Sequence, residues 1–172
     1  VKLDDDDFTL FDLPRRHAIE RAELDRRWRA LQSEVHPDRF AAQGDAAQRV
    51  AMQWAVRVNE AYQRLKDPLR RGAYLCELAG VPIAAESNTA MPAAFLMQQM
   101  AWREALDEAK DAATVQALDD AVVKAERHML SELAASLDGR GDAAAAAAQV
   151  RALMFVRRFR DDIERRLAAH DH

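Results

Sequence analysis

Apolar side chains recur every three or four residues through most of the chain, which is the spacing of one face of an α-helix. Between residues 24 and 65 they form two stripes: Leu24, Trp28, Leu31 and Val35, then Val50, Trp54, Val58, Ala61 and Leu65. Pro37 closes the first stripe, because proline disfavours helical geometry in the residue before it. The pattern predicts two long helices, the second from about 45 to 66, joined by a connection of about ten residues.

Short apolar segments flank this pair of helices. The first is a cluster ended by Pro14 and made of Phe8, Leu10, Phe11 and Leu13. It predicts a short helix or a turn. After the second long helix, Asp67 and Pro68 match a helix N-cap followed by proline at the first helical position. They predict a further short helix that ends at Gly80.

The C-terminal half begins with a stretch rich in Gly, Pro, Ser, Asn and Thr, which indicates a linker over residues 80–91. Three helical segments follow it, with Asp111 as the cap of the second and a break near Gly139. The last two carry the inward stripes Val115, Leu118, Val122, Ala125, Met129 and Leu133, and Val156, Phe159, Ile163 and Leu167. Short turns between helices favour antiparallel neighbours. We therefore expect an all-α chain with an N-terminal helical domain over 1–79 and an antiparallel three-helix bundle over 92–172.

Composition agrees with helices and divides the chain by charge. Only five glycines and five prolines occur among 172 residues, whereas good helix formers recur throughout. The net charge of −4 argues against general affinity for nucleic acid or an acidic membrane. Residues 15–71 carry a net +5, however, and residues 72–172 a net −5. The two halves are therefore expected to meet different partners.

The chain shows no sign of secretion or membrane insertion in its sequence. Its start is acidic, unlike the basic and apolar start of a secretory signal. No apolar run approaches the roughly 20 residues that cross a bilayer. We expect a protein of the bacterial cytoplasm.

The tripeptide His36-Pro37-Asp38 lies in the connection between the two long helices. Such a loop must be exposed, and proline stiffens it, so that less entropy is lost on docking. Asp38 offers a carboxylate that an arginine can grip with two hydrogen bonds, and His36 offers a ring donor. Arg26 and Arg29 lie opposite the apolar stripe of the preceding helix. The pattern indicates a small contact point beside a basic face, although a tripeptide alone occurs by chance in about one chain of this length in a hundred.

The helix predicted from Pro92 to Ala109 is apolar on two sides. Its packing side consists of Phe95, Trp102, Leu106 and Ala109. The far side combines apolar and acidic residues: Leu96, Met97, Met100, Glu104 and Glu108. A bundle helix needs only one buried stripe, so the far side is either a partner surface or packs against the N-terminal domain or the linker. Periodicity leaves both readings open.

Residues 8–78 resemble a J domain, the module that stimulates ATP hydrolysis by DnaK-type chaperones. The matching blocks are Phe8-Thr9-Leu10-Phe11, His36-Pro37-Asp38-Arg39-Phe40, Asn59-Glu60-Ala61-Tyr62 and Asp67-Pro68. In that family this loop and the basic face of the preceding helix dock on the ATPase. The resemblance implies a chaperone-binding role for His36, Pro37, Asp38, Arg26, Arg29, Arg27 and Arg39.

The second module resembles the HscB type of J-domain co-chaperone, which serves iron–sulfur cluster assembly. The resemblance covers nearly the whole chain and is carried by Phe95-Leu96-Met97-x-Gln99-Met100 and Arg103-Glu104-x-Leu106-Asp107-Glu108. In that family the helix, with an aromatic residue of the last helix, binds the scaffold protein IscU. The matching positions are Leu96, Met97, Met100, Glu104, Glu108 and Phe155. Ala101 stands where the family often has an acidic residue, so the contact is expected to be less charged.

Signals of catalysis and of metal binding are absent from the sequence. It contains no glycine-rich phosphate loop and no nucleophile–base pairing. Its five histidines are scattered, and the one cysteine, Cys76, suits a buried apolar position. We expect no enzyme activity, no cofactor and no metal.

Together these features favour an adaptor that stimulates an HscA-type chaperone and delivers an IscU-type scaffold to it. A general J-domain co-chaperone that holds unfolded polypeptides is the alternative. A nucleic-acid-binding module is disfavoured, because the arginines of 15–71 are interleaved with acidic residues.

Overall fold

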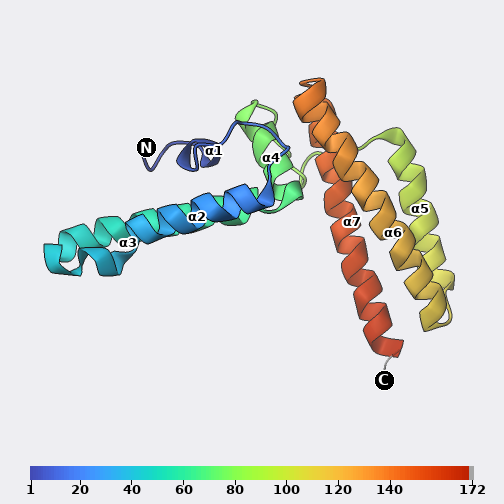
Figure 1. Ribbon diagram of the computed structural model, residues 1–172. Helices are drawn as coiled ribbons and strands as arrows, with labels where there is room; N and C mark the ends of the chain where they lie inside the picture. Colours follow the sequence, from blue (N-terminus) through green and yellow to red (C-terminus); the bar gives the residue numbers. More distant parts are fainter. Residues whose placement is uncertain (171–172) are drawn as a thin grey trace. The chain divides into compact units, whose positions relative to one another are not determined.

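The structure, a computed structural model, describes residues 1–170, and over that range it contains helices and no strand (Figure 1). The all-α prediction is confirmed. Contacts divide the chain into two compact units, Val1–Leu75 and Cys76–His172. We call them the first and the second unit and describe each by itself.

The first unit is built around a helical hairpin. Its elements are α1 (Asp7–Leu10), α2 (Arg21–Val35), the 3-10 helix η1 (Pro37–Gln43), α3 (Asp45–Leu65) and most of α4 (Pro68–Leu78), whose last three residues belong to the second unit. Figure 1 shows α2 and α3 side by side, with η1 at the tip of the hairpin. Phe8, Leu24, Val58 and Leu65 are fully buried between these helices. The Trp28 and Tyr62 rings stack across the hairpin with centroids 4.1 Å apart.

Two details of the hairpin differ from the sequence prediction. Residues 37–43 form a 3-10 helix instead of an irregular loop. Val50, predicted to be buried, is 52% exposed, and Ala51 is buried in its place. Steps of four residues drift by about 40° each around a helix, so Val50 lies about 80° from Val58, whereas Ala51, seven residues away, lies within about 20°.

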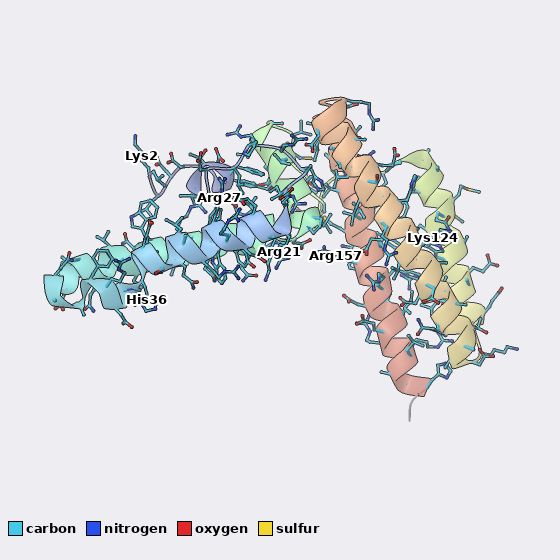
Figure 2. The ribbon with its side chains drawn as sticks, in the orientation of Figure 1. Lys2, Arg21, Arg27, His36, Lys124 and Arg157 are labelled. Carbon is cyan, nitrogen blue, oxygen red and sulfur yellow. The ribbon has the colours of Figure 1, made fainter. Side chains whose placement is uncertain are left out.

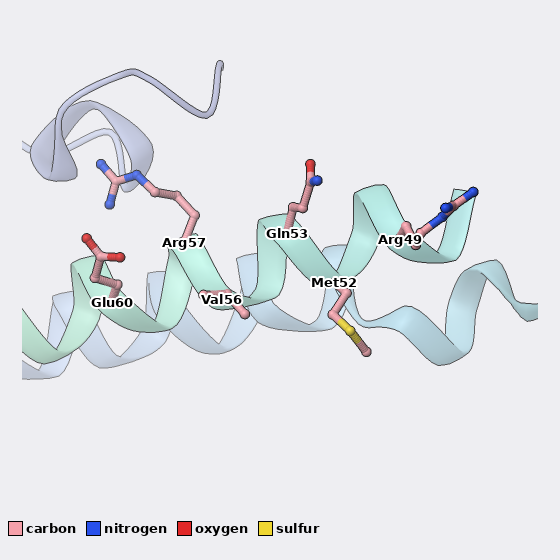
Figure 3. Close-up of a pocket in the computed structure, with 6 residues that line it drawn as sticks. All are labelled: Arg49, Met52, Gln53, Val56, Arg57 and Glu60. Carbon is pink, nitrogen blue, oxygen red and sulfur yellow. The ribbon is translucent and has the colours of Figure 1, made fainter. Parts of the chain in front are cut away.

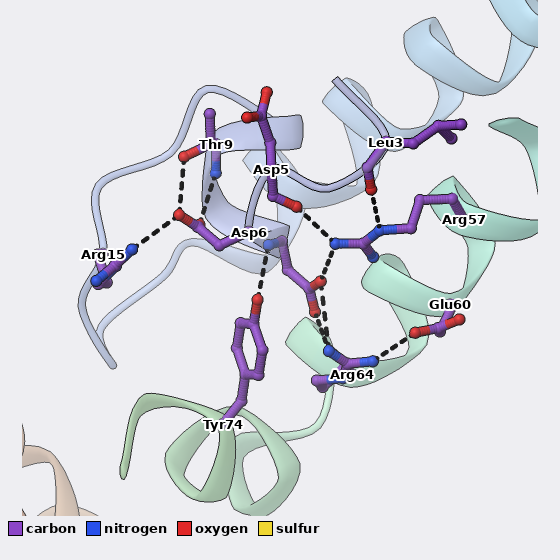
Figure 4. Close-up of polar contacts among 10 residues, drawn as sticks. Leu3, Asp5, Asp6, Thr9, Arg15, Arg57, Glu60, Arg64 and Tyr74 are labelled. Carbon is purple, nitrogen blue, oxygen red and sulfur yellow. Dashed lines mark hydrogen bonds and ion pairs between the residues drawn. The ribbon is translucent and has the colours of Figure 1, made fainter. Parts of the chain in front are cut away.

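A buried carboxylate attaches α1 to the rest of the first unit. Asp7 is fully buried, and its Oδ1 and Oδ2 lie 2.9 Å from Arg57 Nη2 and 3.2 Å from Arg64 Nη1. Its backbone N–H donates to Tyr74 Oη at 3.0 Å. Figure 4 shows both arginines reaching from α3, with Arg57 also donating to the carbonyls of Leu3 and Asp5. Paired charges of this kind fix position, because either partner left alone would be costly to bury.

The second unit is an antiparallel three-helix bundle. It consists of α5 (Ala93–Glu108), α6 (Ala112–Ala134), a π-helical turn η2 (Ala135–Gly139) and α7 (Ala143–His170), as Figure 1 shows. Asp111 caps α6 by accepting from the backbone N–H of Thr114 at 2.7 Å, as predicted. The predicted packing side of α5 is buried: Phe95, Trp102, Leu106 and Ala109.

Aromatic rings hold α5 against α7. Phe159 is fully buried, and its ring stacks on Trp102 and on Phe155 with centroids 6.0 Å apart in both pairs. Phe95 meets Trp102 and Phe155 edge-on at 5.9 and 5.8 Å. Offset and edge-on pairs at such distances stabilise beyond the area they bury. This cluster sets the rotation of α5 and therefore which of its faces points outward.

The segment before α5 is held by one arginine of α7. Arg151 is buried and donates to the carbonyl of Ile83 at 2.9 Å and to that of Ala90 at 2.7 Å. Sequence analysis did not single out Arg151, since carbonyl partners more than 60 residues away leave no local signal.

Candidate functional site

The tripeptide at the tip of the hairpin is a tight, preorganised turn. His36 ends α2 with an extended backbone (φ −61°, ψ 131°) and caps η1, while Pro37 occupies the first turn of η1. The Nδ1 atom of His36 accepts from the backbone N–H of Asp38 at 3.2 Å. The backbone N–H of Arg39 donates to the His36 carbonyl at 3.0 Å. The turn is thus fixed by its own residues.

This geometry decides what the turn can offer to a partner. Because Nδ1 of His36 accepts a hydrogen bond, the neutral ring carries its proton on Nε2, which becomes a donor. The side chains of His36 and Asp38 are 53% and 91% exposed. The turn therefore presents one donor and one carboxylate, side by side, to a partner that brings an acceptor and a cation. Figure 2 shows His36 near the tip of the hairpin.

The outer face of α2, the helix that leads to this turn, carries exposed arginines. Arg26 and Arg29 are exposed, and Arg26 pairs with Glu23 on the same helix. Arg39 lies just after the turn and donates to the Ser33 carbonyl at 3.4 Å. Ion pairs between exposed side chains are weak, so these guanidinium groups remain able to exchange partners.

Arg27 is placed differently from its neighbours on α2. It donates to the carbonyl of Phe11 at 2.9 Å, to the carbonyl of Asp12 and to Glu23 Oε1 at 2.6 Å. Figure 2 shows Arg27 partway along α2. These contacts attach α2 to the turn after α1, so Arg27 has a structural task within the first unit.

Further along the same helix pair, Asp25 joins α2 to α3. It accepts from Arg21 Nε at 2.9 Å and from Tyr62 Oη at 2.7 Å. The hydrogen bond from Arg21 lowers the pKa of the Asp25 carboxyl, with a further contribution from Tyr62. Asp25 therefore stays ionised beside Arg29, whose charge acts on it as well.

An apolar strip on the outer face of α3 was missed by the sequence analysis. Met52 and Val56 are large and exposed there, about 40° apart around the helix. Figure 3 shows Met52 and Val56 on α3 in a shallow hollow that Arg49 and Arg57 also line. A second hollow joins Met52 to Pro37 and Asp38.

The far face of α5 carries the second group of predicted site residues. Leu96, Met97 and Met100 are 49%, 73% and 70% exposed. Glu104 and Glu108 are exposed on the same side of the helix, and Ala101 is exposed as well. An apolar stripe thus runs into an acidic end on one helix face.

Phe155 is the one predicted contact residue that comes from α7. Its ring packs on Phe95 and Phe159, which places Phe155 beside α5 and leaves it half-buried. Its task is therefore double, since the same ring supports the bundle core and reaches the surface.

Cys76 is buried, as predicted, and its Sγ lies 3.8 Å from the carbonyl of Ala143. Burial raises the pKa of its thiol to about 11. Within residues 1–170, no cluster of three or more His, Cys, Asp or Glu side chains is arranged to hold a metal ion. None of the described helices is both long and apolar enough to cross a membrane.

Comparison with known sequences places the chain among co-chaperones. The family described as the HSCB C-terminal oligomerisation domain matches residues 91–164. The co-chaperone protein HscB homolog of Bordetella petrii is 54% identical over 92% of this chain and 94% of its own length. The homolog of Burkholderia mallei is 51% identical over 100% of this chain and 99% of its own length.

Solved structures agree with the sequence relatives. The chaperone HscB from Vibrio cholerae superposes with a TM-score of 0.82 at 36% identity, covering 96% of this chain and 99% of that one. Human co-chaperone protein HscB gives a TM-score of 0.88 at 25% identity, covering 96% of this chain and 84% of that one. Fold and sequence together define a helical co-chaperone. The chain belongs to the HscB family.

Proposed function

We propose that this chain stimulates the ATPase of an HscA-type, DnaK-like chaperone and delivers an IscU-type scaffold to it, assisting iron–sulfur cluster maturation and transfer. Membership of the HscB family supports the co-chaperone part of the proposal. The observation that carries the chaperone contact is the turn at His36, Pro37 and Asp38, which is exposed and held by its own hydrogen bonds.

The proposed chaperone-facing surface consists of that turn and the basic residues beside it. Asp38 would accept from an arginine of the ATPase, and the Nε2 donor of His36 would reach a neighbouring acceptor. Arg26, Arg29 and Arg39 would meet acidic side chains on the same partner. The contacts of Arg27 with the turn after α1 favour a structural role instead.

The proposed scaffold-facing surface is the far face of α5, together with the edge of one ring of α7. Its members are Leu96, Met97, Met100, Glu104, Glu108 and Phe155. Exposed methionines adapt to a partner because their side chains are flexible and polarisable. The carboxylates at the acidic end would steer a basic patch of the scaffold into register.

A chain that carries both surfaces can act by bringing its two partners together, without catalysing a reaction itself. Bound scaffold would be held at a high effective concentration near the chaperone. The proposed partners are two proteins, in the bacterial cytoplasm, without nucleic acid, membrane or cofactor. The family description further suggests that the bundle self-associates.

The chaperone contact is tested with His36→Gln. This variant loses the ring that donates through Nε2 and accepts from the backbone N–H of Asp38 through Nδ1. The efficiency with which the chain stimulates single-turnover ATP hydrolysis by the chaperone should therefore fall at least about a hundredfold. His128→Gln, an exposed histidine of α6, is the matched control and should stimulate normally. Full stimulation by His36→Gln would rule out the proposed chaperone contact.

The scaffold contact is tested with Met97→Ala combined with Phe155→Ala. Loss of two central apolar contacts should weaken scaffold binding by about 2–4 kcal/mol in calorimetry, while basal ATPase stimulation is kept. Met52→Ala on α3 is the control for an exposed methionine, and Met97→Ala alone avoids any change to the bundle core. Binding of unrelated unfolded polypeptides, with none of the scaffold, would favour a general J-domain co-chaperone.

A further inference from the structure

The far face of α5 stands out among the described surfaces of the second unit. The large apolar side chains exposed there are Leu96, Met97 and Met100, and all three lie within about two turns of one helix. Elsewhere in the described part of the bundle, large apolar side chains are buried or half-buried. We therefore expect any partner that binds this unit through apolar contacts to bind at the far face of α5.

A domain that self-associates needs such a surface, and the family match is informative about where it lies. The match to the oligomerisation domain begins at residue 91 and includes the whole of α5. It excludes the other exposed apolar strip, Met52 and Val56 on α3. We propose that a second copy of this chain covers the α5 stripe, so that self-association and scaffold binding exclude each other. The exclusion rests on the scaffold contact proposed above.

Charge on α5 indicates how two copies would meet. Glu104 lies about two turns beyond Met97, towards the C-terminal end of the helix. If two α5 helices cross antiparallel about Met97, each Glu104 lies opposite the start of the other copy's α5. No described side chain caps that start, where Pro92 is the N-cap residue. A carboxylate near an uncapped helix N-terminus is favourable, whereas a parallel pairing would bring the two acidic ends together.

The size of the stripe predicts a weak dimer. A stable interface covers about 800 Å² on each partner, far more than three side chains provide. A two-fold contact would therefore form reversibly and at raised concentration. A scaffold that adds contacts with Phe155 and Glu108 would displace the second copy. At raised concentration, self-association would then cover the apolar stripe in a share of the molecules until a scaffold arrives.

The first experiment is sedimentation of the full chain without scaffold over a range of concentrations. The wild type should shift from monomer towards dimer as concentration rises. Met97→Glu should weaken the dimer at least about tenfold, because two like charges would meet at the centre of the contact. Met52→Glu, an equally exposed methionine on α3, should leave it unchanged. A wild type that stays monomeric, or a loss of the dimer in Met52→Glu instead, overturns the proposal.

A charge variant tests the antiparallel arrangement. Glu104→Lys should raise the dissociation constant of the dimer at least about twofold, since it replaces the carboxylate that faces the helix start. Glu164→Lys on α7 makes the same change at an exposed position outside the stripe. An unchanged dimer in Glu104→Lys overturns the antiparallel arrangement.

The exclusion is tested by adding an IscU-type scaffold to the dimer. One-to-one complexes should replace dimers as scaffold is titrated. A complex that keeps two copies paired while scaffold is bound overturns the exclusion. Absence of any scaffold binding contradicts the proposed function, whereas the scaffold-free sedimentation still decides whether the α5 stripe pairs two copies.

Discussion

The turn at His36 and the apolar stripe on α5 are held in place by different interactions. The turn is polar, and the atoms that shape it come from His36, Asp38 and Arg39 themselves. The stripe is apolar and lies on a regular helix whose rotation is set by rings on its other side, notably Trp102 and Phe159. A local motif can therefore be recognised in a short stretch of sequence, whereas an apolar surface depends on packing elsewhere in its unit.

The cores of the two units show a similar contrast. The first unit attaches α1 through the buried carboxylate of Asp7 and its two arginines. The second unit relies on stacked rings around Phe159. Ring packing tolerates small shifts, whereas a buried charge requires its partners in place. Substitutions in one unit should therefore leave the protection of the other unit's backbone amides from hydrogen exchange unchanged.

The largest expected effect is that of Phe159→Ala. Removing a fully buried ring that stacks on two others should lower the free energy of unfolding of the second unit by about 3–5 kcal/mol. Hydrogen exchange should rise across α5–α7 and stay unchanged in α2 and α3. Met97→Ala, an exposed position, should cost less than about 0.5 kcal/mol. Equal loss of protection in both units would show that their stabilities are coupled.

Asp7→Asn should have the next largest effect. It leaves Arg57 and Arg64 without their carboxylate, at a cost of about 3 kcal/mol to the first unit. Exchange should rise in α1, α3 and α4 but not in the bundle. Asp4→Asn, an exposed neighbour, serves as the control. If both variants behaved alike, the buried pair would contribute no more than a surface charge.

The smallest expected effect is the pH response of Cys76. Its thiol pKa is raised by burial from 9.0 to about 11, so folding favours the protonated form. The stabilising contribution of this thiol is full below pH about 9 and is lost as pH rises towards about 11. The midpoint of urea unfolding should fall over this window, and less so in Cys76→Ala. A disulfide reagent should react at pH 8 only after unfolding; fast reaction of the native chain would show that this end of α4 opens locally.

Sequence predicted the helices well because their stripes are periodic and their caps are local. The buried side of α5 and the cap at Asp111 followed from spacing and residue type alone. Val50 was misplaced because steps of four drift off the buried face. The contacts of Asp7, and those of Arg27 with the carbonyls of Phe11 and Asp12, were out of reach for another reason. Their partners lie 15 to 67 residues away, and no periodicity indicates them.

The hydrogen bonds from Arg151 to Ile83 and Ala90 also have a consequence for biosynthesis. The arginine follows its two carbonyl partners by 68 and 61 residues. At about 5–20 residues per second, a ribosome needs about 3–14 seconds to make that stretch. The hairpin with the His36 turn is therefore complete while residues 83–90 still lack the side chain that holds them. On the nascent chain, the module proposed to bind the chaperone is finished before the segment leading to α5 can be ordered.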